Sequence, residues 1–149
     1  MPAVATKNEI QTLNVHKEVL IDAPIDVVFE TLLDPPGRFG EMSLTLEAWP
    51  GGRWYRDLGN NTGHLWGHVQ VIKPPVLLEL SGPLFMSYPA LNHIEVKLDQ
   101  RPGGTHVDFR HRAIGFIDPA HRQGVTTGWK HILDRVAEDC SAHEDEQGS

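Results

Sequence analysis

Residues 19–29 read VLIDAPIDVVF and join the end of a strand to the start of a helix. The alternating pattern over Val15–Ile21, rich in β-branched side chains, predicts a strand. The segment Asp22-Ala23-Pro24 then supplies an N-cap and a proline at the first helical position, where the missing N–H costs nothing. Asp34-Pro35-Pro36-Gly37 stops the helix, because two consecutive prolines cannot continue it. We therefore expect a strand followed directly by a short helix that ends at Leu33.

The chain after this helix changes to short alternating runs separated by turn residues, from Leu44 to Ile114. This pattern predicts an antiparallel meander, and with the first strand it gives a sheet of six to seven strands. A second, looser helical turn is expected before the meander, around Phe39 and Met42. The fold class is therefore α+β.

A second N-cap and first-turn signature, Asp118-Pro119, predicts a long C-terminal helix that extends to about Asp139. Apolar residues recur along it at three- and four-residue spacing, which predicts one buried face. Gly124 and Gly128 interrupt the helix interior, where each costs about 1 kcal/mol relative to alanine. We expect them to allow a close approach by another group.

Length and composition are typical of one globular domain. The chain has 149 residues, with 40% hydrophobic and 22% charged residues. We expect a flexible N-terminal arm over residues 1–12, the folded domain over 13–139, and an acidic flexible tail over 140–149.

The net charge of −7 opposes binding to nucleic acid, and no apolar run is long enough for membrane insertion. Cys140 is the single cysteine, and the N-terminus has no stretch resembling a signal peptide. We therefore expect a cytoplasmic protein.

Three segments resemble the START-like superfamily, also called SRPBCC or helix-grip. They are residues 19–29, the pair 50–55 and 67–75 in the meander, and residues 128–133 in the last helix. Together they are similar to the branch of homologues of the activator of heat-shock protein 90 ATPase. The resemblance covers roughly residues 13 to 138. It implies two short helices after the first strand and a curved antiparallel sheet wrapped round the long C-terminal helix.

The resemblance also implies a cavity between the sheet and the long helix, which members of such families use for apolar molecules. The chain has no room for a separate chaperone-engaging domain, so a chaperone partner is not expected, although the sequence does not exclude one. Side chains that could line the cavity combine aromatic contact area with a few polar groups. The candidates are Phe39, Met42, Trp54, Trp66, Phe85, Met86, Tyr88, Phe109, His111, Val125 and Trp129.

His111 is the polar member of an otherwise apolar strand face that it shares with Val107 and Phe109. Two interpretations remain open. The imidazole is either a core group satisfied by a neighbouring polar atom, which we favour, or a group that contacts a ligand.

Nine histidines raise the question of a metal site, but their spacing within single strands is unfavourable. His64 and His68 are about 13 Å apart along a strand, and His106 and His111 point to opposite faces. We expect no metal and no cofactor.

The sequence favours a protein that binds a hydrophobic or amphipathic small molecule. The first alternative is a cyclase- or hydrolase-like enzyme in which a cavity histidine acts with a carboxylate, such as Asp57, or a tyrosine. Asp57 fits a surface ion pair with a neighbouring arginine better. The second alternative is a co-chaperone-like protein-interaction module, which would show an exposed apolar patch. A homodimer through an exposed strand edge also remains open.

Overall fold

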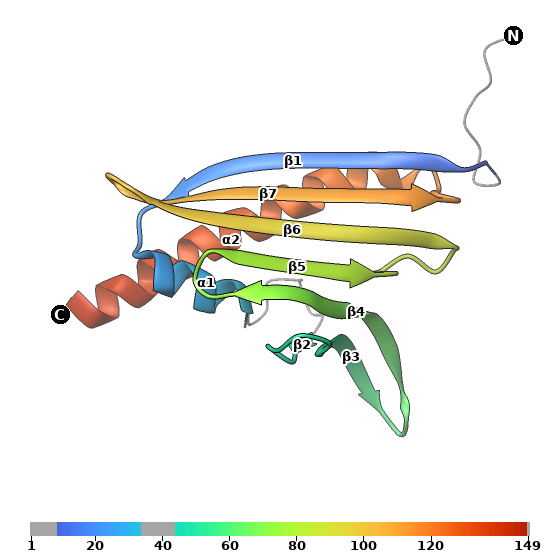
Figure 1. The fold of residues 1–149 in the computed structure, drawn as a ribbon, viewed down its shortest axis with the longest axis horizontal. Helices are drawn as coiled ribbons and strands as arrows, with labels where there is room; N and C mark the ends of the chain where they lie inside the picture. The colour runs from blue at the N-terminus through green and yellow to red at the C-terminus, as the bar shows by residue number, and fades with distance from the viewer. Residues whose placement is uncertain (1–8, 34–43, 149) are drawn as a thin grey trace, which may run out of the picture.

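The computed structural model describes residues 9–33 and 44–148, with side chains described through residue 141. Within these residues, seven strands form an antiparallel sheet in the order β1-β7-β6-β5-β4-β3-β2 (Figure 1). The strands are β1 (Gln11–Ile21), β2 (Thr45–Leu46), β3 (Arg53–Gly59), β4 (Thr62–Lys73), β5 (Leu77–Gly82), β6 (Ala90–Arg101) and β7 (Gly104–Gly115). The helices are α1 (Ile25–Leu33) and α2 (His121–Gly148). This is the predicted helix-grip architecture.

The helices cover one face of the sheet, which we call the inner face. In Figure 1, α2 runs behind β1, β7 and β6, and α1 lies near the middle of its path. Alternation along β7 decides which side chains point inward, as predicted: Val107, Phe109 and His111 are buried, whereas Arg112 between His111 and Ala113 is exposed. The core therefore lies between the inner face and the helices.

A stripe of buried side chains runs along α2 at helical spacing and packs into this core. It comprises Val125, Trp129, Leu133, Val136 and Cys140. Because Cys140 is fully buried, the stripe passes the predicted helix end at residue 139, and α2 extends to Gly148. The expectation of a tail that starts at residue 140 is wrong for this reason.

The N-terminal boundary also differs from the prediction. β1 begins at Gln11, whose Cα pairs with that of Gly115, so residues 11 and 12 belong to the sheet and not to an arm. The Gln11 side-chain amide donates to the Ile117 carbonyl oxygen at 3.0 Å. The helical turn expected around Phe39 and Met42 lies outside the described residues.

Two pairs of glycines have opposite environments. A Cβ on Gly67 would clash with the Ser81 carbonyl oxygen, 2.5 Å away, and a Cβ on Gly82 would clash with the Gly67 Cα. The close approach of β4 and β5 at this point therefore requires glycine at both positions. By contrast, a Cβ on Gly124 or Gly128 would meet nothing within 4 Å. The expectation that these two helical glycines admit a neighbouring group is wrong within the described structure.

Candidate functional site

A buried chain of hydrogen bonds connects α2, β7 and β6 on the inner face. Trp129 Nε1 donates to His111 Nδ1 at 2.8 Å, and His111 Nε2 lies 2.7 Å from Asn92 Oδ1. Asn92 Nδ2 donates in turn to the Pro83 carbonyl oxygen at 3.3 Å. The three side chains are 0–4% exposed. Each polar group therefore has a partner in the core, as its burial requires.

The direction of these bonds determines the protonation of His111. An indole N–H can only donate, so Nδ1 must be the unprotonated acceptor and the proton lies on Nε2, which donates to Asn92. Burial lowers the pKa of His111 from 6.5 to about 4, because the charged imidazolium loses its hydration. His111 is therefore a neutral imidazole with a fixed tautomer at neutral pH.

Asn92 is the member of this network that sequence reasoning missed. It shares the inner face of β6 with Ile94, Val96 and Leu98, all buried. Asn92 is a polar residue among the apolar, inward-facing residues of its strand. The same pattern identified His111 on the neighbouring strand. Because the Cα of Ile94 pairs with that of His111, Asn92 lies diagonally across from His111 and within reach of its ring.

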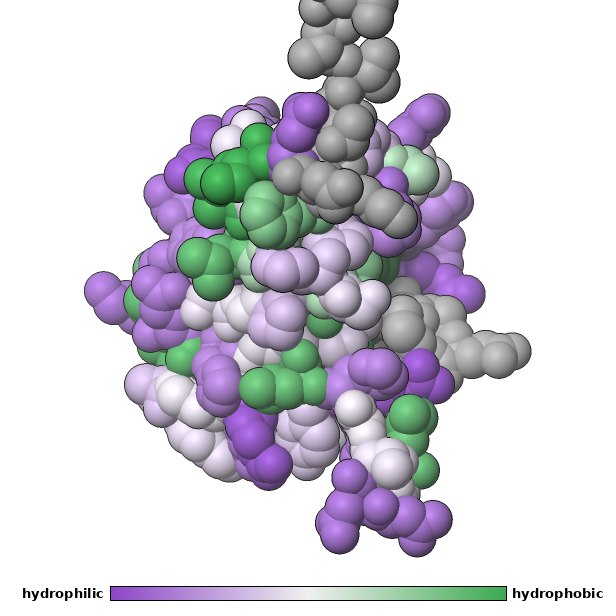
Figure 2. Space-filling model, turned by 90° about the vertical axis from the view of Figure 1, so that its right-hand side faces the viewer, coloured by the Kyte–Doolittle hydropathy of each residue, from purple (hydrophilic) through white to green (hydrophobic). Residues whose placement is uncertain are grey.

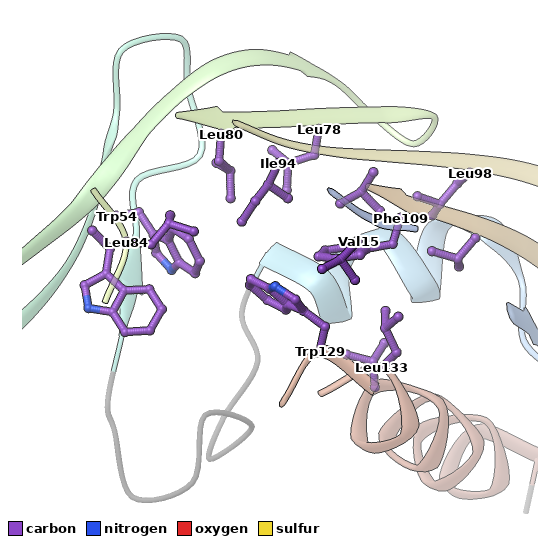
Figure 3. Packing of buried hydrophobic residues seen from close by; sticks show 14 of the residues in the cluster. Val15, Trp54, Leu78, Leu80, Leu84, Ile94, Leu98, Phe109, Trp129 and Leu133 are labelled. Carbon is purple, nitrogen blue, oxygen red and sulfur yellow. The ribbon is translucent and has the colours of Figure 1, made fainter. Parts of the chain in front are cut away.

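A second group of rings lies on the β3–β4 side of the inner face. The Trp54 and Trp66 rings make an edge contact with centroids 5.1 Å apart, and Phe85 makes another with Trp66 at 5.6 Å. Figure 3 shows Trp54 beside Leu84 at the left and Trp129 nearer the centre, with Leu80 and Ile94 above. Both tryptophans are buried, whereas Phe85 is 41% exposed. The rings thus lead from the surface into the core.

The backbone at Leu84 has an unusual conformation. Its φ of 56° lies in the left-handed region, which costs a bulky residue on the order of 1–3 kcal/mol. This conformation buries the Leu84 side chain and leaves the next residue, Phe85, at the surface. The Leu84 N–H donates to the Trp66 carbonyl oxygen at 2.7 Å, which fixes the loop on β4.

Three of the remaining predicted cavity residues lie beside the hydrogen-bond network of Trp129, His111 and Asn92. Phe109 packs on Trp129 with centroids 4.8 Å apart, and Val125 lies one helical turn from Trp129. Met86 Sδ lies 3.5 Å from Asn92 Nδ2. Tyr88 instead stacks on His121, with its hydroxyl 2.9 Å from His121 Nδ1. Phe39 and Met42 lie outside the described residues.

The acid–base pair of the enzyme alternative is not formed at His111. Its two ring nitrogens contact the Trp129 indole and the Asn92 amide, neither of which titrates in the physiological range. Asp57 instead accepts a hydrogen bond from the Gly59 N–H at 2.8 Å and closes the turn between β3 and β4. Within the described residues, Asp57 makes this turn contact and not the predicted ion pair with an arginine.

Two shallow grooves lie on the sheet face away from the helices. One, of about 600 Å³, is lined by apolar residues together with polar side chains that include His68, His93 and Arg112. The other, of about 510 Å³, is lined almost entirely by apolar residues near the start of β6 and the end of β7. Leu91 and Ile114 line both grooves, so the two adjoin.

Comparison with known proteins identifies a family and a fold. The family model described as "Activator of Hsp90 ATPase homolog 1-like protein" matches residues 22–138. No protein with curated function matches the chain. Within the described residues, no helix is both long and apolar enough to cross a bilayer.

Solved structures resemble the chain over most of its length. A protein of unknown function from Staphylococcus aureus is 14% identical, with a TM-score of 0.71 over 92% of this chain and 98% of that one. An uncharacterised protein from Rhizobium leguminosarum is 20% identical, with a TM-score of 0.71 over 90% of this chain and 97% of that one. DynU16, described as a protein in the dynemicin biosynthetic locus, is 18% identical, with a TM-score of 0.63 over 84% of this chain and 46% of that one. At these identities the likeness establishes the fold alone.

Proposed function

Because the chain belongs to the family of Activator of Hsp90 ATPase homolog 1-like proteins, a START-like branch with the helix-grip fold, we propose that it binds a hydrophobic or amphipathic small molecule on its inner face. The observation that carries the proposal is the series of rings from exposed Phe85 through Trp66 to Trp54. Aromatic rings supply large apolar contact areas, and ligand sites are lined mainly by such groups.

Three further features support a ligand at this place. The strained Leu84 backbone holds the loop next to these rings, and strain of this kind is concentrated at functional sites. DynU16, which has the same fold, is described as a protein in the dynemicin biosynthetic locus. The neutral His111 network, elsewhere on the inner face, presents no charge to an apolar ligand.

The test uses the full chain, purified gently, in native mass spectrometry and in titration with the amphipathic dye 1-anilinonaphthalene-8-sulfonate. We expect a retained mass or saturable dye binding for the wild type. Phe85→Ala should weaken this binding several-fold, because it removes the exposed end of the ring series. Trp49→Ala is the matched control, since Trp49 is also an exposed ring, 56% accessible, but lies on the turn before β3. Equal loss in both variants, or no binding by the wild type, contradicts the proposal.

A second candidate function, protein association, is favoured by an exposed apolar patch at one end of the sheet. Four exposed apolar side chains line the apolar groove. They are Ile10, Leu91, Ile114 and Phe116, which are 70%, 74%, 50% and 38% exposed. Figure 2 shows apolar surface gathered toward the upper left of this end of the molecule. Exposed contiguous patches of this kind commonly mark interaction sites.

The partner that fits this patch is a second copy of the chain. The patch borders the start of β1, which is an edge strand of the described sheet, and an edge strand can pair with another chain through its backbone. Light scattering coupled to size-exclusion chromatography should then give a dimer mass for the wild type and a monomer mass for Leu91→Asp. Leu58→Asp changes another exposed leucine, near the end of β3, and should remain a dimer. A monomer mass for the wild type rejects this candidate.

A further inference from the structure

Two short patterns on neighbouring strands place four potential metal ligands on the outer face of the sheet. His16 and Glu18 alternate along β1, and His106 and Asp108 alternate along β7. In the antiparallel register the Cα of Glu18 pairs with that of Asp108. Alternate residues of a strand share a face, so pairing of the two strands brings the four side chains together.

The distances between their polar atoms suit a small cation. His16 Nε2 lies 2.8 Å from Asp108 Oδ1, and His106 Nε2 lies 3.2 Å from Glu18 Oε1. Ligand atoms of His16, Glu18 and Asp108 all lie within 4.8 Å of one another. Ligand atoms around a tetrahedral zinc ion are about 3.3 Å apart, as follows from bond lengths of about 2.0–2.2 Å. Small side-chain rotations therefore suffice to close the site.

The electrostatics of this cluster also favour a cation. Glu18 and Asp108 face each other directly, and like charges at paired positions of a sheet are destabilising. Arg110 Nε is 3.8 Å from Asp108 Oδ1 and offsets part of this repulsion. Lys97, whose Cα pairs with that of Asp108 from the other side, has its Nζ 3.5 Å from Glu95 instead. A divalent ion would neutralise both carboxylates at once.

We propose that His16, Glu18 and Asp108 bind Zn²⁺, with His106 as a positioning residue that holds Glu18 through the 3.2 Å contact between His106 Nε2 and Glu18 Oε1. Imidazole and carboxylate are usual zinc ligands, and a partner that orients a ligating carboxylate is a common part of such sites. Water completes the coordination, since the side chains of His16 and Glu18 are 38% and 55% exposed. The ion joins the edge strand β1 to β7, so its structural effect is to stabilise that edge.

The expectation of no metal considered only the spacing of histidines within single strands. The proposed site is formed by residues of two neighbouring strands. In the part of the chain that the structure describes, this is the group where three such ligands converge. The pair His93–Glu79 has the same 2.8 Å contact on the same face and belongs to no such group among the described residues. It therefore serves as an internal comparison.

The test measures Zn²⁺ uptake by the full chain, free of any affinity tag and stripped of metal by a chelator. We expect one Zn²⁺ per chain by isothermal titration, together with a rise in Tm, because an ion that binds only the folded state stabilises it. His16→Ala and Asp108→Asn should each weaken binding about tenfold or more and abolish the rise in Tm. His106→Ala should weaken it less than either ligand change.

His93→Ala is the matched control and should bind Zn²⁺ as the wild type does. The Tm of each variant without metal shows whether it is folded. The proposal is overturned if the wild type takes up no stoichiometric Zn²⁺. It is also overturned if His16→Ala retains wild-type binding, or if His93→Ala loses binding equally, since uptake would then come from scattered surface histidines.

Discussion

At the scale of single residues, Trp129 has a role beyond filling the core. Its indole N–H is the donor that satisfies His111 Nδ1, so Trp129→Phe leaves a buried acceptor unpaired. An unsatisfied buried group costs about 1–3 kcal/mol, to which the loss of ring volume adds. Urea unfolding should show this destabilisation in Trp129→Phe, whereas Trp49→Phe, at an exposed site, should change the free energy of unfolding by less than about 0.5 kcal/mol. Equal effects in the two variants would refute a structural role for the hydrogen bond.

His111 gives a second prediction at this scale, concerning pH. Its pKa is lowered to about 4 in the folded chain, below the ordinary value of 6.5, so between these values the unfolded chain binds the extra proton. The stability associated with neutral His111 is complete above about pH 6.5 and is lost as pH falls toward 4. At about 1.4 kcal/mol per pKa unit, the loss is about 3 kcal/mol.

Nuclear magnetic resonance measures this directly, because imidazole shifts report protonation of each histidine separately. The His111 ring should keep the shifts of a neutral imidazole with its proton on Nε2 down to about pH 5, as long as the chain stays folded. Titration of the His111 signals near pH 6.5 in folded protein would contradict the assigned burial and tautomer.

At the scale of secondary-structure elements, the glycines of α2 and of the sheet should respond in opposite directions. Gly124→Ala and Gly128→Ala add a methyl group in open space and improve helix propensity, so each should stabilise the chain by up to about 1 kcal/mol. Gly67→Ala should destabilise it, because the new Cβ would lie 2.5 Å from a carbonyl oxygen. Thermal and urea unfolding of the three variants provide the measurement, and destabilisation by Gly128→Ala would show that a group approaches the helix there.

The sequence predicts these elements well where local chemistry decides them. The Asp22-Ala23-Pro24 cap places α1, and the alternation around His111 identifies the inner face of β7, because both signals are contained in a few consecutive residues. The end of α2 was missed because the charged segment after residue 139 resembles a solvated tail, whereas burial of Cys140 depends on the tertiary packing.

The site was predictable only in part for a related reason. Polar residues on apolar faces identify His111, and the same rule applied to β6 would have found Asn92. His16 and Glu18 lie near Asp108 because of the register between β1 and β7. Residue spacing within one strand does not reveal this register. Cross-strand sites therefore require the sheet order before their residues can be grouped.

At the scale of the whole molecule, the sheet is secured unevenly from one side to the other. β6 and β7 pair along their full lengths, from Ala90↔Gly115 to Arg101↔Gly104, and their inner side chains pack against the core. β2 pairs with β3 only through Thr45 and Leu46, and the β3–β4 hairpin projects from the body of the sheet (Figure 1). Leu58 and Leu65 on that hairpin are 51% and 47% exposed.

Local opening should follow this difference in packing. Regions with few buried contacts and exposed backbone hydrogen bonds open at low free energy, whereas core strands open only with the whole domain. Hydrogen–deuterium exchange should therefore find the slowest amides in β6 and β7 and fast exchange at residues 57–63. Addition of Zn²⁺ should slow exchange in β1 and β7, and addition of an inner-face ligand should slow it in β4 and in the loop around Leu84. Because the two effects fall on different strands, a single experiment separates the metal site from the ligand site, and uniform exchange across the sheet would contradict this division.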